Sequence, residues 1–394
     1  MQKKLIALAV AGLASTAAFA QTNVTIYGLV DYGYAYRFDG RGLDSTTNLI
    51  NNAGKPNSAS QLNGGQQSGN RLGFKGTEDL GNGLKAVFLL EQGFNLDTGA
   101  SASTDSFYNR QAYAGLSGGF GTVVGGRLYT PHYTFVSGLD PFGAGTVGRY
   151  NNVYSVVAGA VPGSAFGNLT DPVRVDNAVA YISPSFGGFT VTGAFSNNAS
   201  GNDSLSNNAR NNTVYAVLGQ FDSGALKLGA NYHYIAVGTG LQAVDNVQNF
   251  TLGGSFDFKV AKVMALYSWN EIDYASNTLL QDMTLNNYML GATVPFGKFA
   301  AKGSYIYSDG NSGVGDAQQL ALGLDYNLSK RTNFYTAYSW IDNSGSRMNG
   351  VGDASNAGTY AGAGTAAEQL TGTNGGYLPG VWQQGFQVGL RHMF

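Results

Sequence analysis

The sequence predicts an all-β protein, a sixteen-stranded antiparallel β-barrel that crosses a membrane. Segments of about ten residues with apolar and polar residues in alternation recur along the chain after residue 20. Charged residues make up only 12% of the chain, aromatic residues make up as large a share, 12%, and glycine occurs 58 times. This composition suits a wall with lipid on one face, water on the other and aromatic girdles at both interfaces. On composition alone, a large soluble β-sandwich is also compatible.

The first twenty residues form a separate unit. Lys3 and Lys4 precede an apolar run from Leu5 to about Ala14, and the segment closes with Ala18, Phe19 and Ala20. This order predicts a secretory signal peptide over residues 1–20, cut after Ala20, which leaves a single barrel domain over 21–394. The apolar run is too short for a stable membrane anchor, and no later segment reaches eighteen consecutive apolar residues, so helical membrane spans are excluded.

Alternating segments pair through tight turns rich in Gly, Asn and Asp, as β-hairpins require. An opening strand is expected from about Val24 to Tyr36, and a closing strand lies at the C-terminus, in GFQVGLRHMF. Seven hairpins are expected between them, with turns at Gly81–Gly83, Gly118–Gly121, Phe186–Gly188, Asp222–Gly224, Lys259–Ala261, Pro295–Gly297 and Ser329–Lys330. One opening strand, seven hairpins and one closing strand make sixteen strands.

The connections on the other side of the sheet are long and polar, notably 37–69, 131–175 and 343–383. Barrels of the Gram-negative outer membrane show this asymmetry, with short periplasmic turns and long outer loops. An even strand number places both ends of the sheet on the periplasmic side, where the first and last strands can pair and leave no free edge. The sequence therefore predicts a multi-pass β-barrel of the outer membrane.

Charged residues that share the lumen-facing parity of the strands are candidates for the narrow part of a pore. Alternation selects Asp31, Arg71, Lys75, Lys85, Glu91 and Arg127. For any one of them the alternative is a solvated wall residue with little effect on transport. For Lys85, close to a periplasmic turn, that alternative is preferred.

Several motifs together resemble the Gram-negative general porin family, of the beta-proteobacterial type. They are VTIYGLVD at 24–31, SGNRLGFKGTEDLGNGLKAVFLLEQGF at 68–94, RQAYAGLSGGFGTVVGGRL at 110–128, NLSKRTNFYTAYS at 327–339 and the ending VGLRHMF. The resemblance covers essentially the whole chain after the signal segment. It implies a homotrimer of sixteen-stranded barrels, in each of which the third outer loop folds inward and narrows the pore.

The resemblance also implies constriction residues, position by position. The family's basic positions fall on Arg71, Arg110 and Arg174, and its acidic positions on Glu91 and on Asp140 in loop 3. The sequence departs from the pattern in two places. Loop 3 is poor in acids, since Asp140 is the only one between Pro131 and Thr170, and strict alternation gives Arg110 the parity of Ala112, Ala114 and Leu116. Either a bulge redirects Arg110 or it lies at the loop mouth.

The predicted function is a water-filled general diffusion porin for passive transport of ions and small hydrophilic solutes. Six basic against three acidic candidates suggest a mild preference for anions, although the chain carries a net charge of −2, or −4 without Lys3 and Lys4. Charges at a constriction outweigh screened charges on outer loops. The expected partners are two further copies, outer-membrane lipid and lipopolysaccharide, and the solutes. No nucleic acid, catalysis or cofactor is expected, and His132, His233 and His392 are too far apart in sequence to suggest a metal site.

Three alternatives remain at this level. A solute-specific channel on the same barrel would need a row of aromatic residues or a dense arginine cluster, which sequence alone does not establish. An outer-membrane hydrolase would need a nucleophile beside a base, and isolated histidines argue against it. A secreted soluble adhesin would be extracted without detergent.

Overall fold

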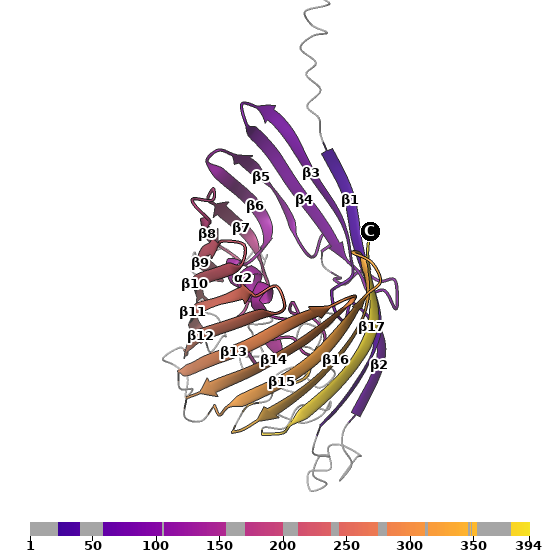
Figure 1. Cartoon of the computed structure of the whole chain (residues 1–394). Coiled ribbons are helices and arrows are strands. Elements are labelled where there is room, and N and C mark those ends of the chain that lie inside the picture. The colour runs from indigo at the N-terminus through magenta and orange to yellow at the C-terminus, as the bar shows by residue number, and fades with distance from the viewer. Residues whose placement is uncertain are drawn as a thin grey trace, which may run out of the picture.

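In the computed structural model the strands close into a barrel (Figure 1). The first strand, β1 (Asn23–Asp39), pairs antiparallel with the last, β17 (Gln383–Met393). Two backbone hydrogen bonds between Gly28 and Phe394, of 3.0 and 3.1 Å, extend this seam. The second and third strand segments both pair with β1, and from the third segment to β17 each strand pairs antiparallel with the next one in sequence, so the described strands close into a ring.

The structure describes residues 23–39, 58–104, 106–154, 170–199, 212–237, 244–274, 282–311, 314–345, 347, 349–352 and 380–394. The elements between β1 and β17 are β2 (Ser58–Gly64), β3 (Arg71–Gly81), β4 (Leu84–Gly93), β5 (Ala112–Gly118), β6 (Gly121–Tyr129), α2 (Pro131–Leu139), α3 (Asn151–Tyr154), β7 (Arg174–Ile182), β8 (Phe189–Ser196), β9 (Thr213–Asp222), β10 (Leu226–Ala236), β11 (Val244–Asp257), β12 (Lys262–Tyr274), β13 (Met283–Phe296), β14 (Phe299–Gly310), β15 (Ala317–Asn327) and β16 (Thr332–Asn343). The predicted signal peptide, 1–20, lies outside the described residues and stays a prediction.

Seventeen strand segments occupy sixteen places in the barrel. β2 pairs with the outer half of β1, from Tyr32 to Phe38, and β3 pairs with the other half, from Asn23 to Leu29. The two segments therefore form one interrupted strand. This confirms the predicted number, but the expected loop 37–69 was wrong in one part, because residues 58–64 belong to the wall.

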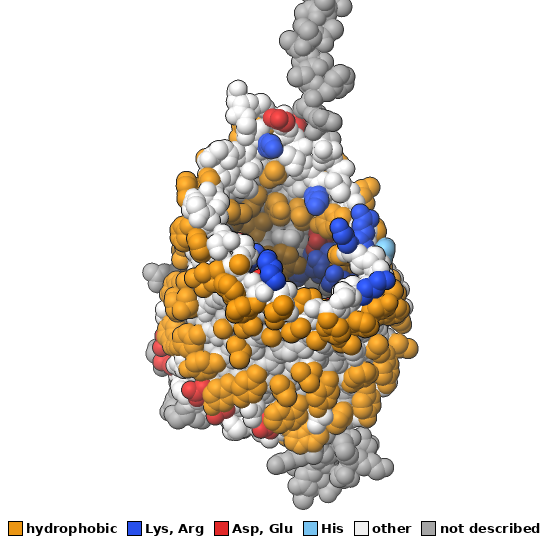
Figure 2. All heavy atoms as spheres, viewed as in Figure 1, with side chains coloured by type: hydrophobic (Ala, Val, Ile, Leu, Met, Phe, Trp, Pro, Cys, Tyr) orange, Lys and Arg blue, Asp and Glu red, His pale blue; other side chains and the backbone are white. Residues whose placement is uncertain are grey.

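The two faces of the strands separate by polarity as predicted. On β17, Phe386, Val388 and Leu390 are 44%, 42% and 40% exposed, whereas Gln387 between them is fully buried. Exposed apolar side chains cover the outside of the barrel (orange in Figure 2). This outer face is the one that a lipid bilayer would cover.

The tight turn between β3 and β4 shows how local sequence sets the hairpins. Asn82 and Gly83 have positive φ angles, 53° and 78°. A two-residue hairpin turn with both φ angles positive matches the right-handed twist of the strands, and Asn-Gly is a sequence that favours it.

The segment between β6 and β7, residues 130–173, is described over 130–154 and 170–173 and is called loop 3 below. It is not a structureless connection: α2 and α3 lie within it, and α2 contacts strands β8 to β12 from inside the barrel (Figure 1). Thr130 caps α2 by accepting a hydrogen bond from the Tyr133 N–H at 3.0 Å, and Pro131 suits the first turn. The inward fold of loop 3 is thus confirmed. Among the described residues, no helix is both long and apolar enough to cross a membrane.

A row of glycines on the inner wall makes room for loop 3, and it is called the glycine belt below. A Cβ atom at any of these positions would lie 2.5 to 2.7 Å from an atom of an apolar loop 3 side chain. Under about 3.0 Å something must shift, so the loop rests directly against the sheet. The belt and its loop 3 contacts are Gly229 with Phe135, Gly253 with Leu139, Gly291 with Pro141 and Gly323 with Phe142.

Candidate pore constriction

Four of the predicted constriction residues meet around one carboxylate. Glu91, near the end of β4, forms an ion pair with Arg110, and Arg71 Nη1 lies 3.8 Å from Glu91 Oε1. The Tyr27 hydroxyl donates to Glu91 Oε2 at 2.9 Å. The Glu91 side chain is only 4% exposed, while that of Arg71 is 22% exposed. The Glu91 carboxylate is therefore the more deeply buried partner, and the Arg71 side chain lies nearer the solvent.

Arg174 joins the cluster through Tyr129. The Tyr129 oxygen accepts hydrogen bonds from Arg110 Nη2 at 2.8 Å and from Arg174 Nη2 at 2.9 Å. The guanidinium carbon of Arg174 lies 4.6 Å from the centroid of the Tyr129 ring, within range of a cation–π interaction. Within the described part of the chain, Arg174 forms no ion pair, and its buried Nε atom has no hydrogen-bond partner. Three positive charges thus face one negative charge.

A bulge brings Arg110 into this cluster. The Glu91 N–H donates to the Gln111 carbonyl at 2.8 Å, and the Arg110 N–H donates to the Glu91 carbonyl at 3.2 Å. Two consecutive residues therefore share one partner, the pattern of a β-bulge, which changes the direction of the side chain. The sequence left open whether a bulge redirects Arg110 or whether it lies at the loop mouth, and the hydrogen bonds favour the bulge.

The other predicted basic residues lie around the cluster. Arg127 forms an ion pair with Asp176 across a register shift between β6 and β7. Lys75 lies 5.4 Å from the centroid of the Tyr27 ring. Lys85 is exposed and lies opposite Ser117 near the β3–β4 turn, away from the carboxylate.

Asp31 lies apart from the cluster and is fully buried. Its carboxylate accepts hydrogen bonds from the backbone N–H groups of Gln67 and Ser68, both at 2.6 Å, and from the Tyr335 hydroxyl at 2.6 Å. These contacts attach the break between β2 and β3 to β1 and β16. The burial gives Asp31 a structural role rather than an open position in the lumen.

Asp140 also has a buried, structural position, at the end of α2. Its carboxylate accepts hydrogen bonds from the N–H groups of Phe142, Ala144 and Tyr150, at 3.0, 2.9 and 3.1 Å. Burial raises the pKa of Asp140 to about 6, although the three donors oppose that shift. Asp140 therefore organises the turn of loop 3.

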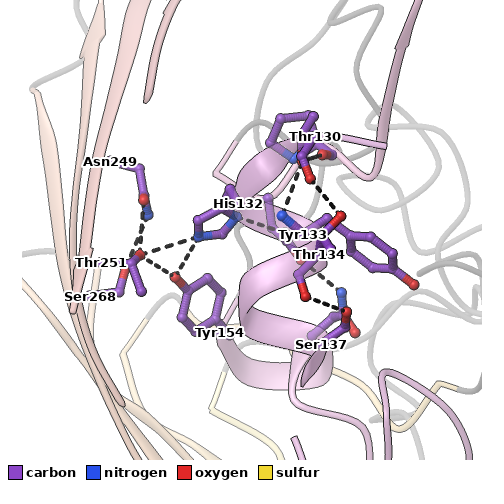
Figure 3. A network of polar contacts seen from close by, with 12 residues as sticks. Thr130, His132, Tyr133, Thr134, Ser137, Tyr154, Asn249, Thr251 and Ser268 are labelled. Atoms are coloured by element: carbon purple, nitrogen blue, oxygen red, sulfur yellow. Dashed lines mark hydrogen bonds and ion pairs between the residues drawn. The ribbon is translucent and has the colours of Figure 1, made fainter. Parts of the chain in front are cut away.

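His132 on α2 connects loop 3 to the opposite wall (Figure 3). One ring nitrogen, Nδ1, lies 3.0 Å from Asp171, and the other lies 2.9 Å from the Tyr154 hydroxyl and 3.2 Å from the Thr251 hydroxyl on β11. The His233 ring approaches His132 edge-on, with centroids 5.0 Å apart, a proximity that the sequence spacing did not suggest. The described residues contain no group of three or more residues suited to a metal ion.

A cavity of about 780 Å³ lies beside the arginines, bounded by β1, β3 to β9 and α2. Tyr129 and Lys75 belong to its lining, together with Thr134 of α2. Figure 2 shows an opening in the molecule with Lys and Arg side chains near its rim and apolar side chains on its wall. The free part of the lumen thus lies between the cluster and one side of loop 3.

Sequence reasoning missed two features of this site. Tyr129, which joins Arg110 to Arg174, is the last residue of β6 and carries no charge to mark it. The glycine belt did leave a signal. Four strands carry a leucine directly before the belt glycine, with the leucine exposed on the outer face: Leu228, Leu252, Leu290 and Leu322.

Comparisons with known proteins agree with this architecture. The sequence profile described as Gram-negative porin matches residues 7–346. Outer membrane porin protein 32 of Delftia acidovorans is 34% identical over 400 residues, covering 100% of both chains. An outer membrane porin protein of Bordetella pertussis is 31% identical over 383 residues, which covers 87% of this chain and 95% of the relative.

Solved structures give the same result. The anion-selective porin from Comamonas acidovorans has a TM-score of 0.74 and 28% identity, and the match covers 95% of this chain and 100% of that one. These relatives are channel-forming proteins of the outer membrane and not enzymes. The chain therefore belongs to the Gram-negative porin family and is an outer-membrane general porin.

Proposed function

We propose that this porin prefers anions and that Arg71, Arg110 and Arg174 are the principal cause. The observation that carries the proposal is the three-to-one charge ratio around Glu91, with Arg174 unpaired among the described residues. Charges at the narrow part of a pore set ion preference, because the walls of low dielectric constant focus their field.

The net charge of the whole chain does not oppose this proposal. Acidic residues on outer loops are in bulk water, where salt screens their field within about 8–10 Å. The arginines lie beside the cavity, where a permeating ion would pass close to them. One structural relative, with 28% identity, is an anion-selective porin, and this similarity supports the same preference here.

We further propose that the solutes are inorganic ions and small hydrophilic molecules, that the protein assembles as a homotrimer in outer-membrane lipid with lipopolysaccharide, and that residues 1–20 are removed on export. The family membership supports these points. Chemical cross-linking of purified protein tests the trimer, and N-terminal sequencing of the exported form tests cleavage after Ala20.

The proposed preference is tested on purified protein in a planar bilayer with a potassium chloride gradient. The expected result is stepwise openings with a reversal potential shifted toward the equilibrium potential of chloride. Openings with a reversal potential on the potassium side would leave the porin function in place and overturn the proposed role of the arginines.

A further inference from the structure

The cavity beside the arginine cluster has an unusual lining for an aqueous pore. Of the described residues that line it, one is charged, Lys75, and none is acidic. On β4 to β7 and on β9, apolar side chains occupy lumen-facing positions. Polar residues are expected at such positions in a water-filled barrel. They include Val87, Leu89, Tyr113, Val124, Ile182 and Leu218.

The strand register brings these side chains into rows. Leu89 on β4 lies directly opposite Tyr113 on β5, and Tyr113 lies opposite Gly126 on β6. Val124 pairs with Gly115, the next residue of β5 with the same parity as Tyr113. At Gly115 and Gly126 the neighbouring backbone fills the place of a side chain, since a Cβ atom at either position would clash with a backbone carbonyl oxygen of the adjacent strand. Leu89, Tyr113 and Val124 form an apolar wall of the cavity, and this part of the cavity is called the hollow below.

The hollow continues directly into the arginine cluster. Leu89 precedes Glu91 by two residues, so their side chains share a face and are separated by roughly 7 Å along the strand. Tyr129 belongs to both features, because it lines the cavity and accepts hydrogen bonds from Arg110 and Arg174. A solute of moderate size can therefore reach guanidinium groups and apolar wall at the same time.

We infer that this hollow is a binding site for amphiphilic monocarboxylates, in which the carboxylate meets Arg71 and Arg174 while an aryl or short alkyl group contacts Leu89 and Tyr113. The inference rests on the proposed anion preference and adds a class of solute to it. Arg174 forms no ion pair among the described residues, so its positive charge is available to an anion, and guanidinium groups bind carboxylates well. The aromatic ring of Tyr113 provides a stacking surface for an aryl group.

Charge complementarity selects this occupant over a neutral apolar one. The cluster has two more positive than negative charges, and a neutral hydrocarbon would leave them without a partner. A strongly hydrated anion such as chloride would use the arginines and gain nothing from the apolar wall.

The experiment compares three sodium salts at pH 7 on the full-length, membrane-inserted protein: phenylacetate, acetate and gluconate. Each is added to a chloride solution, and the block of chloride current and the reversal potential are recorded. A bilayer without protein serves as the control for direct lipid permeation. Phenylacetate is expected to reduce chloride current at concentrations about tenfold lower than acetate or gluconate, since only phenylacetate buries an apolar group in the hollow.

Matched substitutions at Leu89 locate the site. Leu89→Asn keeps the number and branching of the side-chain heavy atoms but makes the wall polar, whereas Leu89→Met keeps it apolar at similar volume. The first variant is expected to lose most of the difference between phenylacetate and acetate, and the second to retain it. Tyr113→Ser is expected to act like Leu89→Asn.

The outcomes separate the two proposals. A chloride-side reversal potential without any difference between phenylacetate and acetate would overturn the amphiphile site and leave the anion preference intact. An equal phenylacetate block in Leu89→Asn and Leu89→Met would also overturn it. A potassium-side reversal potential in plain chloride would overturn the anion preference itself.

Discussion

The two sides of the barrel interior differ in what covers them. On the side of β10 to β15, loop 3 lies against the glycine belt, and the contacts are those of a protein core. On the side of β3 to β9, the wall faces the cavity with the arginine cluster at its edge. The same alternating strand pattern therefore serves two purposes. Glycines that lie against loop 3 side chains mark the half that receives protein, and charged or larger side chains line the half that receives solute.

The comparison also shows that loop 3 determines which half of the lumen stays open. α2 contacts the wall over β8 to β12 while its exposed Thr134 lines the cavity on the other side. Since the loop is fixed by close packing and buried hydrogen bonds, its position is as specific as that of a core helix. We expect the largest effects from substitutions where loop 3 packs against the wall, and smaller effects from substitutions on the side that faces the cavity.

Filling the glycine belt is expected to have the largest effect. In Gly229→Leu, the first atom of the new side chain would lie 2.5 Å from the Phe135 ring, so loop 3 must move or the wall must distort. Overpacking of this kind costs about 3 kcal/mol at its upper range. We expect the compact band of Gly229→Leu on detergent gels to disappear at a lower temperature than that of the wild type. We also expect its single-channel current to be noisier.

Gly193→Leu is the matched control, because nothing lies within 4 Å of a Cβ atom at Gly193 on β8. It should change neither reading. Equal effects of the two substitutions would show that the belt has no special role in holding the loop.

Removing the link between α2 and β11 should have a smaller effect. His132→Ala takes away hydrogen-bond partners of Asp171, Tyr154 and Thr251 in a fully buried site, at a cost of about 2 kcal/mol. We expect more frequent brief closures or openings in bilayer recordings. Ser137→Ala on the same helix, outside the cavity lining, should leave the recordings unchanged, and the same flicker in both variants would contradict this role of His132.

Acidification tests the turn at Asp140. Because burial raises its pKa to about 6, above its ordinary value, the protonated form is favoured in the folded state. The stabilisation is fully present below about pH 4 and is lost as pH rises through 6. Going from pH 7 to pH 5 should therefore stabilise the turn by about 1.4 kcal/mol.

The measurement is the current noise of the wild type and of Asp140→Asn over this pH range. The wild type should become quieter relative to the variant at the lower pH. Noise that follows the same pH curve in both proteins would exclude Asp140 as the source of the dependence.

On the open side, Glu91→Gln should strengthen the anion preference. The change removes the one negative charge among three arginines, and at the distances of this cluster the effect on a passing anion is about 1 kcal/mol or less. The anion-to-cation permeability ratio, taken from the reversal potential, should rise by up to about fivefold. A fall in that ratio would mean that Glu91 holds the arginines in place more than it offsets their charge.

Much of the wall could be predicted from the sequence, because strand faces follow a period of two and tight turns have characteristic residues. Arg71 and Glu91 share a face, as their parity indicated, and exposure alternates along β17 as expected. The alternation within one strand does not indicate which other segments of the chain pack against its inner face. Asp31 has the parity of a pore residue and Asp140 has the position that the family resemblance assigns to one, yet hydrogen-bond donors from a distant strand and from the loop backbone bury them.

The course of loop 3 could not be derived from local sequence, because it depends on contacts with strands far along the chain. Arg110 illustrates a smaller limit: a single bulged residue reverses the parity on which face assignment depends. The strand segment β2, residues 58–64, was missed for a different reason, because its polar Ser, Gln and Asn residues look like loop residues.

We propose that unpaired arginine charge beside the cavity sets the ion preference, and Arg174→Gln tests this proposal most directly. Arg174 has no carboxylate partner among the described residues, so its loss removes a positive charge without leaving a buried negative one. Lys330→Gln, on an exposed turn, removes the same charge away from the pore. The account predicts that the reversal potential in a potassium chloride gradient shifts toward potassium in Arg174→Gln and stays unchanged in Lys330→Gln. An equal shift in both variants, or none in Arg174→Gln, would contradict the claim.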